Sequence, residues 1–149
     1  MDVWHSTSFG IYAIFATGLC LMLMSIDGAS GASRAKTKTA VNAEDKAFAK
    51  DLQIVPDDPE PVARVMRAHR NALANVIPFL AVMFLFVALG ASSTWVLALC
   101  GVFSFARLVH VFAYVGAKQP FRTLSFLVGQ ICTVIAAVQV IRVAFTIAM

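Results

Sequence analysis

Four long apolar runs, separated by polar stretches, dominate the pattern of this chain. At 1.5 Å per helical residue, runs of this length can cross a hydrocarbon core about 30 Å thick. The polar stretch at residues 27–61 is predicted to be a connecting loop with a short helix over 43–52. Short turns near 90–93 and 117–120 make the last three helices antiparallel neighbours. The pattern predicts a single four-helix membrane domain over residues 1–149, an all-α fold, with helices at about 6–26, 62–89, 94–117 and 121–147.

The first apolar run, residues 9–26, has a second interpretation as a cleavable signal peptide. The small residues 28–30 suit a cleavage site, but the first residues lack the positive charge that precedes the apolar core of such peptides. We therefore interpret the run as the first membrane helix, with the signal peptide as the alternative.

Composition supports a membrane protein. The chain is 60% hydrophobic and only 13% charged, and its mean hydropathy is +0.80, too apolar for a soluble domain of this size. The net charge of +4 does not indicate a nucleic-acid partner, because the basic residues lie among apolar runs rather than on a polar surface. The three cysteines lie in different apolar segments without metal-binding spacing, so no metal site is expected.

The distribution of Lys and Arg predicts the orientation in the membrane. Four spans place both termini on one side. The charged loop 27–61 and the turn at 117–120 lie on the other side, while the turn at 90–93 is uncharged. By the positive-inside rule, the charged loops face the cytoplasm and the termini face away from it.

No carboxylate side chain follows Glu60, whereas seven cationic residues do. The apolar part of the second helix, residues 76–89, is too short to span alone, so its cationic turns must also enter the membrane, at least to headgroup depth. An Arg at the bilayer centre costs about 2.5–3.5 kcal/mol on insertion scales. We therefore expect the counter-charge to come from an anion outside the chain. The cations are Arg64, Arg67, Arg70, Arg107, Lys118, Arg122 and Arg142.

Three groups of polar residues should meet at the cytoplasmic end of the bundle. Helical spacing places each group on one face of its helix. The N-terminal N–H groups of the fourth helix would add positive potential there. The groups are Arg64, Arg67, Arg70 and Asn71 on the second helix, Arg107, His110 and Tyr114 on the third, and Arg122 with Thr123 at the start of the fourth.

A simpler interpretation is that the arginines extend to anionic lipid headgroups. It is the better one for Arg64, Lys118 and Arg142. It is weaker for Arg107, because His110 and Tyr114 share its face and contact with headgroups requires neither.

Three separated motifs resemble the MAPEG family, the membrane-associated proteins in eicosanoid and glutathione metabolism, nearest its microsomal glutathione transferase and prostaglandin E synthase branch. The resemblance extends from the first span to the last. The motifs are Arg67-Ala68-His69-Arg70-Asn71 followed by Val76-Ile77-Pro78-Phe79, then Arg107-x-x-His110-x-x-x-Tyr114, then Pro120-x-Arg122-Thr123.

The resemblance implies a homotrimer of four-helix subunits with glutathione bound between neighbours near the cytoplasmic face. It also implies a transferase or peroxidase that acts on lipophilic electrophiles or lipid hydroperoxides entering from the bilayer. Arg122 would stabilise the glutathione thiolate, and Thr123 occupies the place of a family hydroxyl residue. The residues expected to bind glutathione are Arg67, Arg70, Asn71, Arg107, His110 and Tyr114.

Two positions depart from the family pattern. That pattern runs R-A-H-x-N-x-x-E, and Ala74 stands at the acidic position; Phe126 stands where relatives often have Tyr. A carboxylate at position 74 would suit the glutathione ammonium, so its loss favours an alternative: a non-catalytic MAPEG-like protein that binds a fatty-acid or lipid anion. A purely structural membrane protein would leave the three polar groups unexplained.

Overall fold

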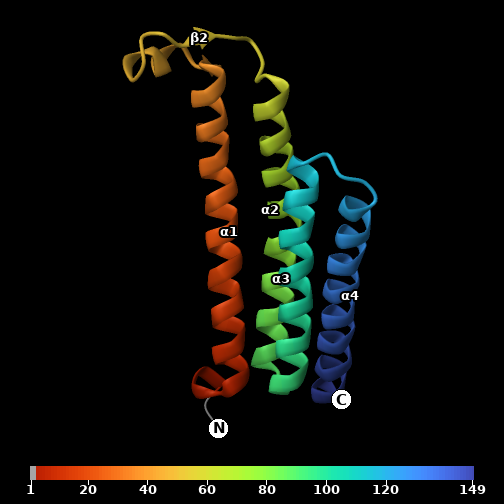
Figure 1. Cartoon of the computed structure of the whole chain (residues 1–149). Helices are drawn as coiled ribbons and strands as arrows, with labels where there is room; N and C mark the ends of the chain where they lie inside the picture. The colour runs from red at the N-terminus through yellow and green to blue at the C-terminus, as the bar shows by residue number, and fades with distance from the viewer. Residues whose placement is uncertain (1–2) are drawn as a thin grey trace.

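The fold consists of four long helices that lie side by side (Figure 1). The computed structural model describes residues 3–149, and all four helices are long and apolar enough to cross a membrane. The predicted all-α class with four transmembrane helices is confirmed. The elements are the 3-10 helix η1 (Val3–His5), α1 (Thr7–Thr37), β1 (Thr39–Ala40), the 3-10 helix η2 (Ala43–Ala47), β2 (Gln53–Ile54), α2 (Glu60–Ala88), α3 (Ser93–Val115) and α4 (Phe121–Ala148).

The first helix is longer than predicted. It continues to Thr37 instead of ending near residue 26, so the prediction that 27–37 belong to a loop was wrong. Residues 27–37 lose hydropathy but contain no proline, and Ala, Arg and Lys among them favour helix. Ser30 is buried in this extension and bonds the carbonyl of Asp27. The helix ends where Lys38 takes a left-handed conformation with φ 53°.

The connection from α1 to α2 contains little regular structure. β1 and β2 form a short parallel pair with Thr39 opposite Gln53. The helix predicted over 43–52 is present only as the 3-10 helix η2. A bidentate ion pair between Arg34 and Asp58, with N–O distances of 3.0 and 2.8 Å, joins the end of α1 to the segment before α2. Both chain termini lie at the opposite end of the bundle from this connection (Figure 1).

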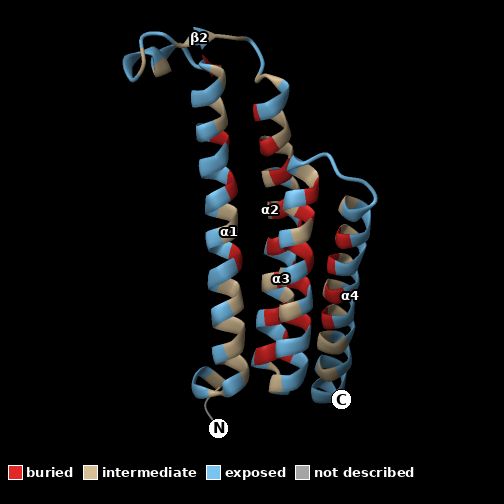
Figure 2. Ribbon diagram, in the orientation of Figure 1, coloured by how far each residue is buried: buried red, intermediate tan, exposed pale blue. Residues whose placement is uncertain are grey.

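The core lies between the helices, and α4 contributes mainly small residues to it. Phe79 of α2 stacks on Phe103 of α3, with ring centroids 3.6 Å apart. The buried residues of α4 are Ser125, Gly129, Cys132 and Ala136, which allow α4 to approach α3 closely. The larger apolar residues of α4 are mostly exposed in the single subunit, as the pale outer face in Figure 2 shows.

Candidate functional site

Polar side chains from α2, α3 and α4 gather toward the end of the bundle opposite the termini. His110 of α3 contacts the backbone of Arg122 at the start of α4, and Arg107 of α3 contacts the backbone of Ser125. Tyr114, also on α3, interacts with the Arg67 guanidinium of α2. The three predicted polar groups are therefore neighbours.

The cations at the start of α2 have a counter-charge within the chain. Nη2 of Arg67 donates to both carboxylate oxygens of Glu60, at 2.9 and 3.0 Å, and Nη2 of Arg64 donates to Oε1 at 2.8 Å. The expectation that these cations rely on an outside anion was wrong for this pair. The reason is that α2 begins at Glu60 rather than at residue 62, which places the carboxylate one and two turns before the arginines on one face.

Further along α2, Arg70 is exposed and Asn71 is half-buried. The Oδ1 atom of Asn71 is buried and has no hydrogen-bond partner within residues 3–149. One turn later, Asn75 donates to the Asn71 carbonyl at 2.7 Å and accepts a hydrogen bond from Gln130 of α4. Sequence reasoning missed Asn75 and Gln130, although an Asn four residues after Asn71, at the edge of an apolar run, was a usable signal.

Arg107 is the largest side chain that the subunit buries completely, at 1% exposure. Its Nη2 donates to the carbonyls of Ser125 and Phe126, both at 3.0 Å. The guanidinium lies 5.4 Å from the ring centroid of Phe103 and 5.6 Å from that of Phe126. These carbonyls and aromatic faces offset part of the cost of burying the charge, while Nε and Nη1 are buried without a hydrogen-bond partner within residues 3–149. The side chain predicted to bind glutathione is thus enclosed between α3 and α4.

His110 lies on the same face of α3 and is 3% exposed. Its Nδ1 is 2.9 Å from the carbonyl oxygen of Arg122. Because a carbonyl can only accept, Nδ1 carries the proton, and Nε2 is left as an acceptor. Within residues 3–149, Nε2 has no partner. His110 therefore has one nitrogen committed to α4 and one available to a ligand.

Arg122 is half-buried beside Tyr114, with Cζ 5.0 Å from the centroid of the Tyr ring. With the Gln119 amide oriented to satisfy both neighbours, its oxygen accepts from Nη2 of Arg122 at 2.8 Å and its nitrogen donates to Thr123 at 3.1 Å. No Asp or Glu among residues 3–149 forms an ion pair with Arg122. This guanidinium is held in place yet keeps a positive charge available to an anion.

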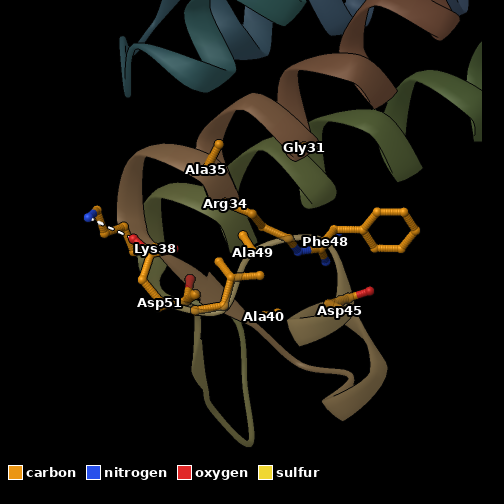
Figure 3. Close-up of a pocket in the computed structure, with 11 residues that line it drawn as sticks. Gly31, Arg34, Ala35, Lys38, Ala40, Asp45, Phe48, Ala49 and Asp51 are labelled. Carbon is orange, nitrogen blue, oxygen red and sulfur yellow. Dashed lines mark hydrogen bonds and ion pairs between the residues drawn. The ribbon is translucent and has the colours of Figure 1, made fainter.

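A separate pocket of about 350 Å³ lies between the end of α1 and the connection to α2 (Figure 3). Sequence reasoning did not single out this pocket. Lys38 and Asp51 form an ion pair of 2.9 Å at one edge, and the ring of Phe48 points away at the other. The hydrogen bond between the pair raises the pKa of Lys38 and lowers the pKa of Asp51. Arg34 also lines the pocket but is paired with Asp58, so these cations are already compensated.

An apolar groove of about 450 Å³ lies between α1 and α3, and Val65 of α2 also lines it. Met22 and Ile26 of α1 face Val111 and Phe112 of α3 across it. The groove is formed mainly by apolar residues of helices that are long and apolar enough to cross a membrane, so its lining suits an apolar chain rather than a polar ligand.

Comparison with known proteins decides the family. The MAPEG family model matches residues 10–142. The chain is 34% identical to microsomal glutathione S-transferase 1 of Mus musculus, over 88% of this chain and 87% of that relative. It is 33% identical to prostaglandin E synthase of Bos taurus, over 75% and 73%, and 33% identical to microsomal glutathione S-transferase 1 of Homo sapiens, over 95% and 94%. The chain belongs to the MAPEG family. With four membrane-length helices, this MAPEG protein is a multi-pass integral membrane protein.

The two departures from the expected MAPEG pattern lie beside this cluster. Ala74 is exposed on α2, one turn after Asn71, so a longer side chain has room there. Phe126 is half-buried and its ring centroid is 6.0 Å from that of His110. Phe126 therefore contributes packing at a position where a phenol hydroxyl would add a donor.

Proposed function

We propose that this protein is a glutathione-dependent membrane transferase or peroxidase that acts on lipophilic electrophiles or lipid hydroperoxides. The observation that carries the proposal is Arg122: a half-buried guanidinium held by Tyr114 and Gln119 and without an acidic partner in residues 3–149. Two relatives are named as a glutathione S-transferase and a prostaglandin E synthase, which supports a glutathione-related enzyme.

The residues present fit glutathione, which carries two carboxylates, an ammonium group and a thiol. Arg70, and Arg67 in addition to its pairing with Glu60, would bind carboxylates. The unpartnered Oδ1 of Asn71 can accept a hydrogen bond from an N–H group. His110 offers Nε2 as a further acceptor, and Tyr114 offers its hydroxyl. Bound glutathione would supply the nucleophile, as a thiolate.

Arg122 would stabilise the negative charge on the glutathione sulfur. At about 5 Å and an effective dielectric constant of about 20, two unit charges interact by about 3 kcal/mol. That corresponds to a decrease of about two units in the thiol pKa, from about 8.5 toward neutrality. Thr123 carries a hydroxyl next to Arg122 that can donate to the same sulfur.

We also propose that the site is completed by a neighbouring copy in a homotrimer, with the charged loops in the cytoplasm. Thr123 and the adjacent Leu124 and Leu127 of α4 are exposed in the single subunit. A second subunit packed on this face would exclude water from the Arg122 region and strengthen its electrostatic effect. The lipophilic substrate would reach the site from the surrounding lipids.

The second candidate function is non-catalytic binding of a fatty-acid or lipid anion. The observation that favours it is Ala74, which leaves α2 without an acidic residue after Glu60 to pair with the glutathione ammonium. The groove between α1 and α3 could hold the acyl chain of such a ligand.

The test is to add glutathione to purified protein in mild detergent and to follow thiolate absorbance and calorimetric heat separately. We expect heat and a thiolate signal from the wild type. Arg122→Ala should raise the pKa of the bound thiol by about two units and largely spare binding. Arg142→Ala is the control, because Arg142 bonds Gln139 near the far end of α4. Heat with a fatty acid but none with glutathione would favour the second function.

A further inference from the structure

Helix α3 donates three side-chain hydrogen bonds to backbone carbonyls in the first turns of α4. Nη2 of Arg107 bonds the carbonyls of Ser125 and Phe126, each at 3.0 Å, and Nδ1 of His110 bonds the carbonyl of Arg122 at 2.9 Å. A carbonyl oxygen has two lone pairs, so it can accept such a bond in addition to its helical one. The backbone segment that carries Arg122 is therefore held laterally by α3.

The contact between Arg107 and α4 depends on Gly129. A Cβ atom at position 129 would lie 2.8 Å from both Cζ and Nε of Arg107, closer than Cβ atoms come to other heavy atoms in proteins. Any other residue at this position would displace the guanidinium or push α4 away from α3. The guanidinium therefore fits against α4 only because position 129 has no Cβ.

The same face of α3 also orients the Arg122 side chain. Tyr114 lies one turn beyond His110 and places its ring 5.0 Å from Cζ of Arg122. Arg107 and His110 fix the backbone of the segment, and Tyr114 contacts the side chain that it carries.

We infer that Arg107, and His110 through its Nδ1 atom, are positioning residues that set where the Arg122 guanidinium stands, while Nε2 of His110 stays available to the ligand. This inference rests on the proposed role of Arg122 in stabilising a thiolate. It is supported by the 1% exposure of Arg107 and by the two hydrogen bonds of its Nη2 atom, which end on α4; its Nε and Nη1 are buried without a partner in residues 3–149. Neutral carbonyls do not require a cation, so what Arg107 supplies is a donor that reaches two adjacent carbonyls at once.

Two substitutions of His110 separate positioning from ligand binding. The amide nitrogen of Asn can replace Nδ1 as the donor to the Arg122 carbonyl, whereas the amide of Gln reaches the place of Nε2. If His110 positions α4, His110→Asn keeps the low thiol pKa and His110→Gln raises it by about one unit, a tenfold change in ionisation. Glutathione affinity should change by less than about threefold in His110→Gln, which keeps a group at the place of Nε2, and fall in His110→Asn, which loses it. The opposite order of thiol pKa values, low in His110→Gln and raised in His110→Asn, would overturn the inference.

A glycine pair tests the packing without altering a polar group. Gly129→Ala should raise the thiol pKa as His110→Gln does, because the added methyl meets the Arg107 guanidinium. Gly101→Ala is the matched control, since its added Cβ would lie 3.9 Å from Cζ of Phe15, an ordinary contact. Equal thiol pKa values in the two alanine variants would contradict the inference.

Amide hydrogen exchange tests the same contact without glutathione. Exchange over residues 121–130 should be faster in His110→Gln than in the wild type and in His110→Asn, because the lateral bond is lost. If the wild type forms no thiolate, the proposed function fails, but the exchange measurement still tests whether the His110 bond holds the start of α4. Unchanged exchange over 121–130 in His110→Gln would mean that the bond does not hold the segment.

Discussion

Ala74→Glu distinguishes the two candidate functions. Ala74 is exposed on α2, one turn after Arg70 and Asn71. A glutamate here needs no rearrangement of the core, and its carboxylate would lie beside the residues proposed to bind glutathione. The substitution therefore changes charge at the site with little change in packing.

Two opposing effects set the magnitude. A charge-assisted hydrogen bond to the ammonium group of glutathione is worth about 1–3 kcal/mol. The new carboxylate can also pair with Arg70 four residues earlier, an interaction of about 0.2–0.5 kcal/mol that would have to be given up. The difference is a gain of about 0.5–2.8 kcal/mol, or roughly a twofold to hundredfold increase in glutathione affinity. For a lipid anion, which has no ammonium group, the carboxylate would repel the ligand and lower its affinity.

Titration calorimetry with both ligands measures these effects directly. Ala74→Gln is the matched control, since it has nearly the same shape without the charge. N-acetylated glutathione is the matched ligand, since it lacks the ammonium group and should gain nothing. The reasoning is refuted if Ala74→Glu leaves glutathione affinity unchanged, or if the gain is equal for the acetylated ligand.

Three further predictions concern assembly and the charged end of the bundle. Native mass spectrometry in mild detergent should show a trimer, and a stable monomer that binds glutathione fully would exclude a site between subunits. Glu60→Gln should free Arg67 and increase the affinity for an anionic ligand, but not in an Arg67→Ala background. Calorimetry of the wild type, the two single variants and the double variant measures this effect. A lower affinity in Glu60→Gln would mean that Glu60 helps to bind the ligand. Because the Lys38 bond lowers the pKa of Asp51, the pair should persist above that lowered pKa and be lost only as the pH falls through it; NMR titration should show Asp51 returning to an ordinary pKa in Lys38→Met.

Hydropathy predicted the four helices well but missed the end of the first. Apolar runs report which residues can lie in hydrocarbon, whereas a helix ends where the backbone finds a cap. In α1 that point is Lys38, past the polar residues 27–37. The extension packs the buried Ser30 and carries Arg34 to Asp58. Neither the buried contact nor the ion pair can be seen in a hydropathy pattern.

Helical spacing identified the faces that carry the site, but not the partners of each side chain. The spacing of Arg107, His110 and Tyr114 on α3 was a correct signal that they share one face. Two of the three bond backbone carbonyls of α4, and every residue has a carbonyl, so sequence could not name these acceptors. The need for glycine at position 129 was also hidden, because the sequence does not show that this position lies against the Arg107 guanidinium.

The structure reduces the number of positive charges that a ligand can find. Of the seven cations that follow Glu60, Arg70 and Arg122 lie in the cluster without an acidic partner or a buried backbone contact in residues 3–149. Glutathione with its thiol ionised carries two carboxylates, one thiolate and one ammonium, a net charge of −2, which two guanidinium groups balance. A fatty-acid anion carries −1 and would leave one of them uncompensated near the membrane, at a cost. The charges available after folding therefore favour an ionised thiol peptide over a lipid monocarboxylate. Of the remaining cations, Arg64 and Arg67 share the one negative charge of Glu60, so a net charge of +1 stays at the start of α2 and adds to the preference for a multiply charged anion. Arg107 contacts α4 carbonyls, Arg142 bonds Gln139, and Lys118 lies in the exposed turn.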